Sequence, residues 1–110
     1  MAEDKFLQEF IQECSQAVES ETSEKFVGWE TILTVLVIGG LKMLLPELKE
    51  WLKLGATVIT TKRLALQKRL EEYALEKELD FATAEKAAAV IANQINEENI
   101  GRIIRELEVG

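Results

Sequence analysis

The feature that most constrains this chain is an uncharged stretch of eleven residues, 31–41, in a sequence in which 30% of the residues are charged. The apolar character continues past Lys42 to Leu45 without a turn signal, and Pro46 ends it. No second strand-like run is present to pair with this stretch, so we predict a helix over about 24–45 with Ser23 as its N-cap. A helix that is apolar on every side belongs either in the centre of a bundle or in lipid.

Other segments show the apolar spacing of amphipathic helices. Residues 3–21 have this spacing, and so do 62–78 and a segment that begins after a predicted N-cap at Thr83. Pro46 suits the first turn of a short helix over 46–54, and Gly55 suits its C-cap. After Ile95 the apolar phase changes, which indicates a last short helix with Asn96 as its N-cap. Residues 57–61 fit either a helical turn or a connector.

These patterns predict an all-α fold, a small bundle of four to six helices around the central apolar helix. A length of 110 residues predicts one helical domain over 1–110. The two adjacent glycines, Gly39 and Gly40, remove side chains inside the central helix. We expect another helix to approach closely there.

The residue types present exclude most catalytic and metal-binding chemistry. The chain has no histidine and one cysteine, which removes His-based acid–base catalysis, nearly all zinc sites and disulfide frameworks. Cys14 lies on the apolar stripe of 3–21 and is interpreted as a core residue. Glutamate pairs with i, i+4 spacing, such as Glu9 and Glu13, are interpreted as solvated helix faces. We expect no enzyme activity, no cofactor and no metal.

The leading functional hypothesis is a non-enzymatic module that binds a protein partner or a second copy of itself through apolar helix stripes. The amphipathic helices together have more apolar surface than one central helix can cover. The small alanine side chains on one of these helices allow another helix to pack closely. The residues predicted to carry the interaction are Leu66, Leu70, Tyr73, Ala84, Ala88, Ile91 and Ile95.

The alternative hypothesis is a small membrane-associated protein inserted through residues 26–45. Tryptophans flank this segment, and a basic cluster follows it that could lie on lipid headgroups. The residues predicted to contact the membrane are Trp29, Lys42, Lys49, Trp51, Lys53, Lys62 and Arg63. An apolar run this short is more often a buried core helix, which favours the bundle.

The charge of the chain is −7, and its middle third is the only basic part. Direct nucleic-acid binding is disfavoured because the overall field repels phosphates. A second alternative is an acidic inhibitor that occupies the basic groove of a nucleic-acid-binding protein. The single free thiol fits a cytoplasmic location. The membrane hypothesis implies that the protein is also associated with a membrane there.

Overall fold

The computed structural model describes residues 5–21, 28–55 and 57–109, which are helical apart from short connections. The elements in chain order are α1 (Lys5–Glu21), α2 (Trp29–Thr34), η2 (Val35–Leu41), α3 (Leu45–Leu54), α4 (Val58–Thr61), α5 (Arg63–Glu76), α6 (Phe81–Gln94) and α7 (Ile100–Val109). No strand forms in these ranges. The predicted all-α bundle is therefore confirmed, and the uncertain stretch 57–61 contains the single turn α4.

Helix α1 buries one side, as its spacing predicts. The buried side chains on it are Leu7, Phe10, Ile11, Cys14 and Val18. Phe6 and Ala17 are partly buried at the edge of the same stripe. Burial of such side chains away from water is the main favourable term in folding, at about 25 cal/mol per Å² of apolar surface.

The segments α2 and η2 form one continuous helix, called α2–η2 below, which contacts α1, α5 and α6. The predicted cap at Ser23 and the predicted start of this helix at Glu24 lie outside the described residues. Gly28, with a φ of 139°, precedes the first turn. Val35–Leu41 is wound as a π-helix, in which each N–H donates to the carbonyl five residues back. Such turns are rare and often lie near functional sites.

The paired glycines do allow close approach of another helix. A Cβ added to Gly40 would lie 3.1 Å from Leu70 Cδ2, and one added to Gly39 would overlap the Tyr73 hydroxyl. Both side chains come from α5, so α5 packs directly onto the backbone of η2. The chain then bends by 69° into α3. Pro46 lies in the first turn of α3, where its missing N–H costs nothing.

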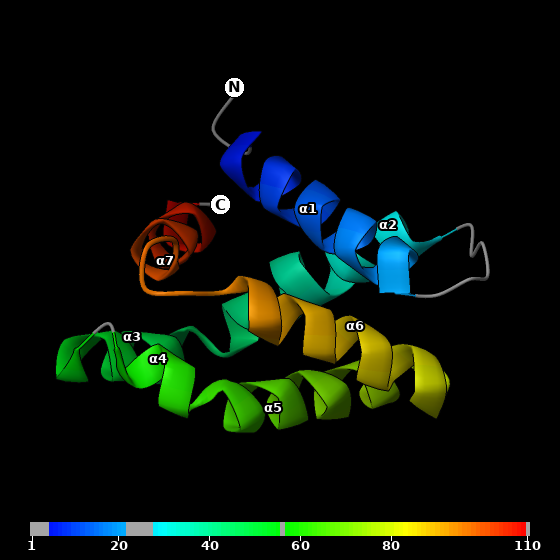
Figure 1. Cartoon of the computed structure of the whole chain (residues 1–110). Helices are drawn as coiled ribbons and strands as arrows, with labels where there is room; N and C mark the ends of the chain where they lie inside the picture. Colours follow the sequence, from blue (N-terminus) through cyan, green and yellow to red (C-terminus); the bar gives the residue numbers. More distant parts are fainter. Residues whose placement is uncertain (1–4, 22–27, 56, 110) are drawn as a thin grey trace.

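Helices α5 and α6 form the most extensive helix pair, and α6 lies between α5 and α1 (Figure 1). The turn between the pair is a Schellman motif. Leu79 N–H donates to the Ala74 carbonyl at 3.2 Å and Glu78 N–H donates to the Leu75 carbonyl at 3.0 Å. Glu78 takes the left-handed position with a φ of 69°.

The predicted N-cap at Thr83 is wrong, because α6 begins earlier and Asp80 is its cap. The Asp80 carboxylate accepts hydrogen bonds from the Thr83 N–H at 3.2 Å and the Thr83 hydroxyl at 2.7 Å. Asp80 is extended and lies outside the helix, whereas Thr83 is already in its first turn. Both residue types favour caps, so spacing alone did not distinguish them.

Helix α7 closes one end of the bundle against α3 and α1. Its apolar stripe is buried, the Arg102 guanidinium lies 4.6 Å from the centroid of the Phe6 ring, and Lys49 of α3 forms an ion pair with Glu108. The Asn96 side chain accepts from the N–H groups of Glu98 and Asn99, as a capping residue does. Glu97 and Glu98 precede α7 in that capped turn.

Candidate interaction surface

The residues predicted to carry an interaction lie inside the fold. Leu66 and Leu70 of α5 are 0% exposed, and so are the predicted residues of α6 and the connection after it, Ala84, Ala88, Ile91 and Ile95. Tyr73 is partly buried against η2. The stripes of α5 and α6 thus bury each other within one chain, and little of them is left at the surface for a second protein.

The predicted membrane-contact residues are scattered among different roles. Trp29 is a core residue with 5% exposure, and Trp51 is half-buried. Arg63 donates from Nε to the Ala92 carbonyl at 2.9 Å and from Nη2 to the Ile95 carbonyl at 2.6 Å. It therefore satisfies carbonyls at the C-terminal end of α6, where the helix itself supplies no N–H donor. Lys42, Lys49, Lys53 and Lys62 are exposed, and Lys49 is engaged with Glu108.

Within the described ranges, no single helix is both long and apolar enough to cross a bilayer. Trp29–Leu41 and Leu45–Leu54 reach that length and composition only as a pair, and the pair is sharply bent.

The side chain of Cys14 is fully buried, as its place on the stripe predicts. Burial raises the pKa of its thiol to about 12, and the nearby charge of Glu13 adds to the shift. The thiolate is the nucleophilic form of cysteine, so this side chain is inert at neutral pH.

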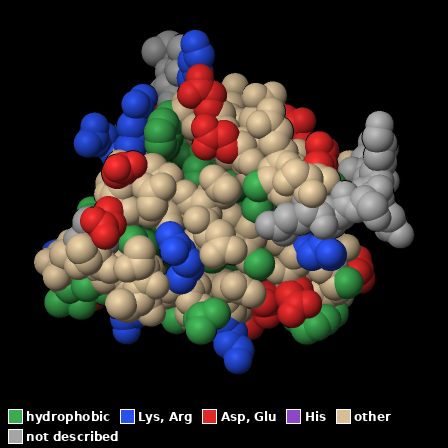
Figure 2. Space-filling view, viewed as in Figure 1, with side chains coloured by type: hydrophobic (Ala, Val, Ile, Leu, Met, Phe, Trp, Pro, Cys, Tyr) green, Lys and Arg blue, Asp and Glu red, His purple; other side chains and the backbone are tan. Residues whose placement is uncertain are grey.

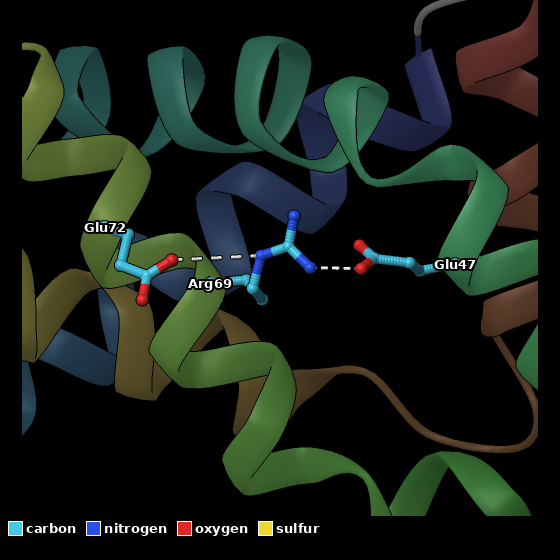
Figure 3. A network of polar contacts seen from close by, with 3 residues as sticks. All are labelled: Glu47, Arg69 and Glu72. Atoms are coloured by element: carbon cyan, nitrogen blue, oxygen red, sulfur yellow. Dashed lines mark hydrogen bonds and ion pairs between the residues drawn. The ribbon is translucent and has the colours of Figure 1, made fainter.

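No group of three or more His, Cys, Asp or Glu side chains in the described part of the chain is placed to hold a metal ion. A charged cluster is centred on Arg69 of α5 (Figure 3). Arg69 pairs with Glu47 of α3, and its Nε lies 3.9 Å from Oε1 of Glu72. All three side chains are substantially exposed. Exposed ion pairs contribute about 0–1 kcal/mol, so this cluster links α3 to α5 weakly.

A groove of about 570 Å³ lies between α1 and α2–η2. Leu7 and Ile11 lie at its base, where both are almost fully buried. Its α1 side carries Lys5, Gln8, Glu9 and Gln12, and its other side carries Glu30, Thr34 and Ile38. The groove has room for side chains from another molecule, and it has apolar and polar groups along its length.

The solvent side of α2–η2 borders this groove. Its exposed residues are Glu30, Thr31, Thr34, Val35, Ile38 and Lys42, and they are called the α2–η2 face below. Val35 is 40% exposed and Ile38 is 39% exposed. Between Glu30 and Lys42 this face has no charge. The helix predicted to be apolar on all sides is central, but one side of it meets solvent.

Other exposed hydrophobic side chains have different settings. Leu54 and Val109 end their helices, and Phe81 begins one. Met43, Leu64 and Leu75 are each next to a charged residue in the chain. On the face of the molecule seen in Figure 2, hydrophobic side chains reach the surface at separate places among charged ones. Val35 and Ile38 differ because they lie one turn apart on one helix side, inside the uncharged run 31–41.

Sequence reasoning missed Val35 and Ile38 as surface residues because every position in the uncharged run looked equally buried.

No family of known proteins, no curated protein and no solved structure matches this chain.

Proposed function

We propose that this chain is a non-enzymatic helical interaction module that binds another protein through the α2–η2 face. The observation that carries the proposal is the exposure of Val35 and Ile38 on a helix side without charge from residue 31 to residue 41. Single exposed hydrophobic residues are normal on soluble proteins, whereas adjoining exposed apolar residues beside a groove are typical of binding surfaces.

The surrounding surface supports the same function. The groove beside the α2–η2 face offers Gln8 and Gln12, whose amides both donate and accept hydrogen bonds. An apolar centre with a polar border is the usual anatomy of a protein–protein interface. The short length of the face limits the buried area, so we expect a weak, reversible complex.

The experiment that tests this function places a photoactivatable amino acid at Ile38 in the full chain, expressed in cells. The matched control places the same amino acid at Lys68, which is exposed on α5 among charged residues. Protein adducts at position 38 that are absent at position 68 support the proposal. Equal labelling at both positions, or no protein adduct at position 38, contradicts it.

A second candidate function is membrane association through the same segment. It is favoured by the bent pair Trp29–Leu41 and Leu45–Leu54, which together have the length and composition of a broken span. In the experiment above, this candidate predicts lipid adducts at Ile38 in place of protein adducts. Flotation with anionic vesicles, weakened when Lys42 and Lys53 are neutralised, is its independent test.

A further inference from the structure

The α2–η2 face has an ordered pattern of charge along its length. Glu30 lies at its N-terminal end and Lys42 at its C-terminal end, each six residues from position 36. Val35 and Ile38 lie on either side of that position, with the uncharged Thr31 and Thr34 between them and Glu30. The face is therefore negative at one end, apolar in the middle and positive at the other end.

From this pattern we infer that the partner of the α2–η2 face is the same face of a second copy of this chain, packed antiparallel about a two-fold axis near residue 36. This inference rests on the proposed function and names its partner. A two-fold interface must be self-complementary, because the same patch of each copy forms both sides of it.

Antiparallel packing satisfies that condition at the charged ends of the face and in its apolar centre. It places Glu30 of one copy beside Lys42 of the other, twice per dimer, and it brings Val35 of one copy to Ile38 of the other. Parallel packing would place like charges together at both ends, which is unfavourable. The charges thus specify the direction of pairing, and the apolar centre supplies the contact area.

The neighbouring surface has room for a second copy. The groove beside the face is about 570 Å³ in volume, and its α1 side carries the uncharged Gln8 and Gln12 together with one residue of each charge, Lys5 and Glu9. Thr31 and Thr34 are small, which permits close approach of a second helix. Thr34 already donates its hydroxyl hydrogen to the Glu30 carbonyl at 2.7 Å, so it needs no partner.

The test is a charge-reversal cycle on the purified full chain. Sedimentation equilibrium is run from about 10 µM to about 1 mM, the range in which a small interface associates. The variants are Glu30→Lys, Lys42→Glu and the double variant, which keeps the parent charge of −7. Lys68→Glu on α5 and Glu85→Lys on α6 are exposed controls that change the charge equally.

We expect the parent to dimerise. Each single reversal should raise the dissociation constant of the dimer about tenfold, and the double variant should have a dissociation constant within about threefold of the parent's. The controls should stay within about threefold of the parent. A parent that is monomeric throughout this range overturns the inference. Failure of the double variant to recover also overturns it, since recovery requires each charge to meet the other across the axis.

A second readout reports directly which residues lie near the two-fold axis. Val35→Cys should be linked to a second copy by a short bismaleimide, whereas Lys68→Cys should not. Cys14 does not interfere because it is fully buried. Equal linking of the two variants contradicts the inference.

Failure of the dimer is distinguishable from failure of the proposed function. Photo-crosslinking at Ile38 to a different protein, with a monomeric parent, overturns the inference and leaves the interaction function standing. Absence of any protein adduct at Ile38 overturns both.

Discussion

The hydroxyl of Tyr73 on α5 occupies the position that a Cβ of Gly39 would take, so the contact between η2 and α5 depends on a missing side chain. A Cβ added to Gly40 would lie 3.3 Å from Cδ2 of the Tyr73 ring, and the Lys77 ammonium lies 5.3 Å from the centroid of that ring. The ring therefore has neighbours besides Gly39, and a shift away from Gly39 would disturb these contacts.

Gly39→Ala should destabilise the protein by about 1–2 kcal/mol, even though alanine is the better helix former, because the new methyl overlaps the Tyr73 hydroxyl. Gly101→Ala is the matched control, since a Cβ there meets nothing within 4 Å. It should stabilise by about 0.5–1 kcal/mol. Urea unfolding measures both.

Tyr73→Phe should recover most of the loss in the Gly39→Ala background, because it removes the overlapping oxygen. A Gly39→Ala variant that is as stable as Gly101→Ala would show that η2 and α5 are not in this contact.

Glu78→Gly should stabilise the turn between α5 and α6 by about 0.5–1 kcal/mol. Glu78 has a φ of 69°, a conformation that costs a residue with a Cβ about 1–2 kcal/mol and costs glycine almost nothing. The greater freedom of glycine in the unfolded chain offsets part of the gain. Glu78→Ala removes the same charge without relieving the backbone, so only the glycine variant should raise the urea midpoint.

Arg63→Ala should lower the free energy of unfolding by about 1–3 kcal/mol. The guanidinium donates to the carbonyls of Ala92 and Ile95, and its loss leaves both without that partner at the end of α6. Arg63→Lys should recover only part of the loss, because an ammonium lacks the planar fork that reaches both oxygens. Lys62→Ala, at the exposed neighbouring position, is the control and should change stability by less than about 0.5 kcal/mol.

Stability should depend on the ionisation of Asp80 at acidic pH. The hydroxyl and the N–H of Thr83 both donate to the Asp80 carboxylate. These two hydrogen bonds, the hydroxyl's being the larger cause, hold the pKa of Asp80 below its ordinary value of 3.8. A carboxyl whose pKa is lower in the folded state contributes stability above the unfolded pKa and loses it as the pH falls through the folded pKa. The advantage of the parent over Asp80→Ala should be complete at pH 7 and should shrink below pH 3.8.

Thr83→Val provides the check on this cause. It removes the hydroxyl that accounts for the largest part of the shift, so the pKa of Asp80 should move back toward 3.8. NMR titration of the Asp80 carboxyl carbon measures the shift directly. An unchanged pKa in Thr83→Val would contradict the assignment of the cap.

Much of the fold could be predicted from local signals. The spacing of Leu7, Phe10 and Ile11 gave the buried side of α1, and Pro46 and Gly55 marked the two ends of α3 correctly. These features follow from helix periodicity and from the backbone chemistry of proline and glycine, which act within a few residues. Asn96 was recognised as a capping residue for the same reason.

The candidate surface could not be predicted in this way. The uncharged run left every side of α2–η2 equivalent, and only the positions of α1, α5 and α6 left Val35 and Ile38 outside while enclosing Leu36 and Val37. Likewise, Arg63 reaches carbonyls 29 and 32 residues away in the chain. Local chemistry therefore decided where the helices begin and end in the sequence. Which side chains are buried depended on which helices pack together, because exclusion of water is a property of the packed chain.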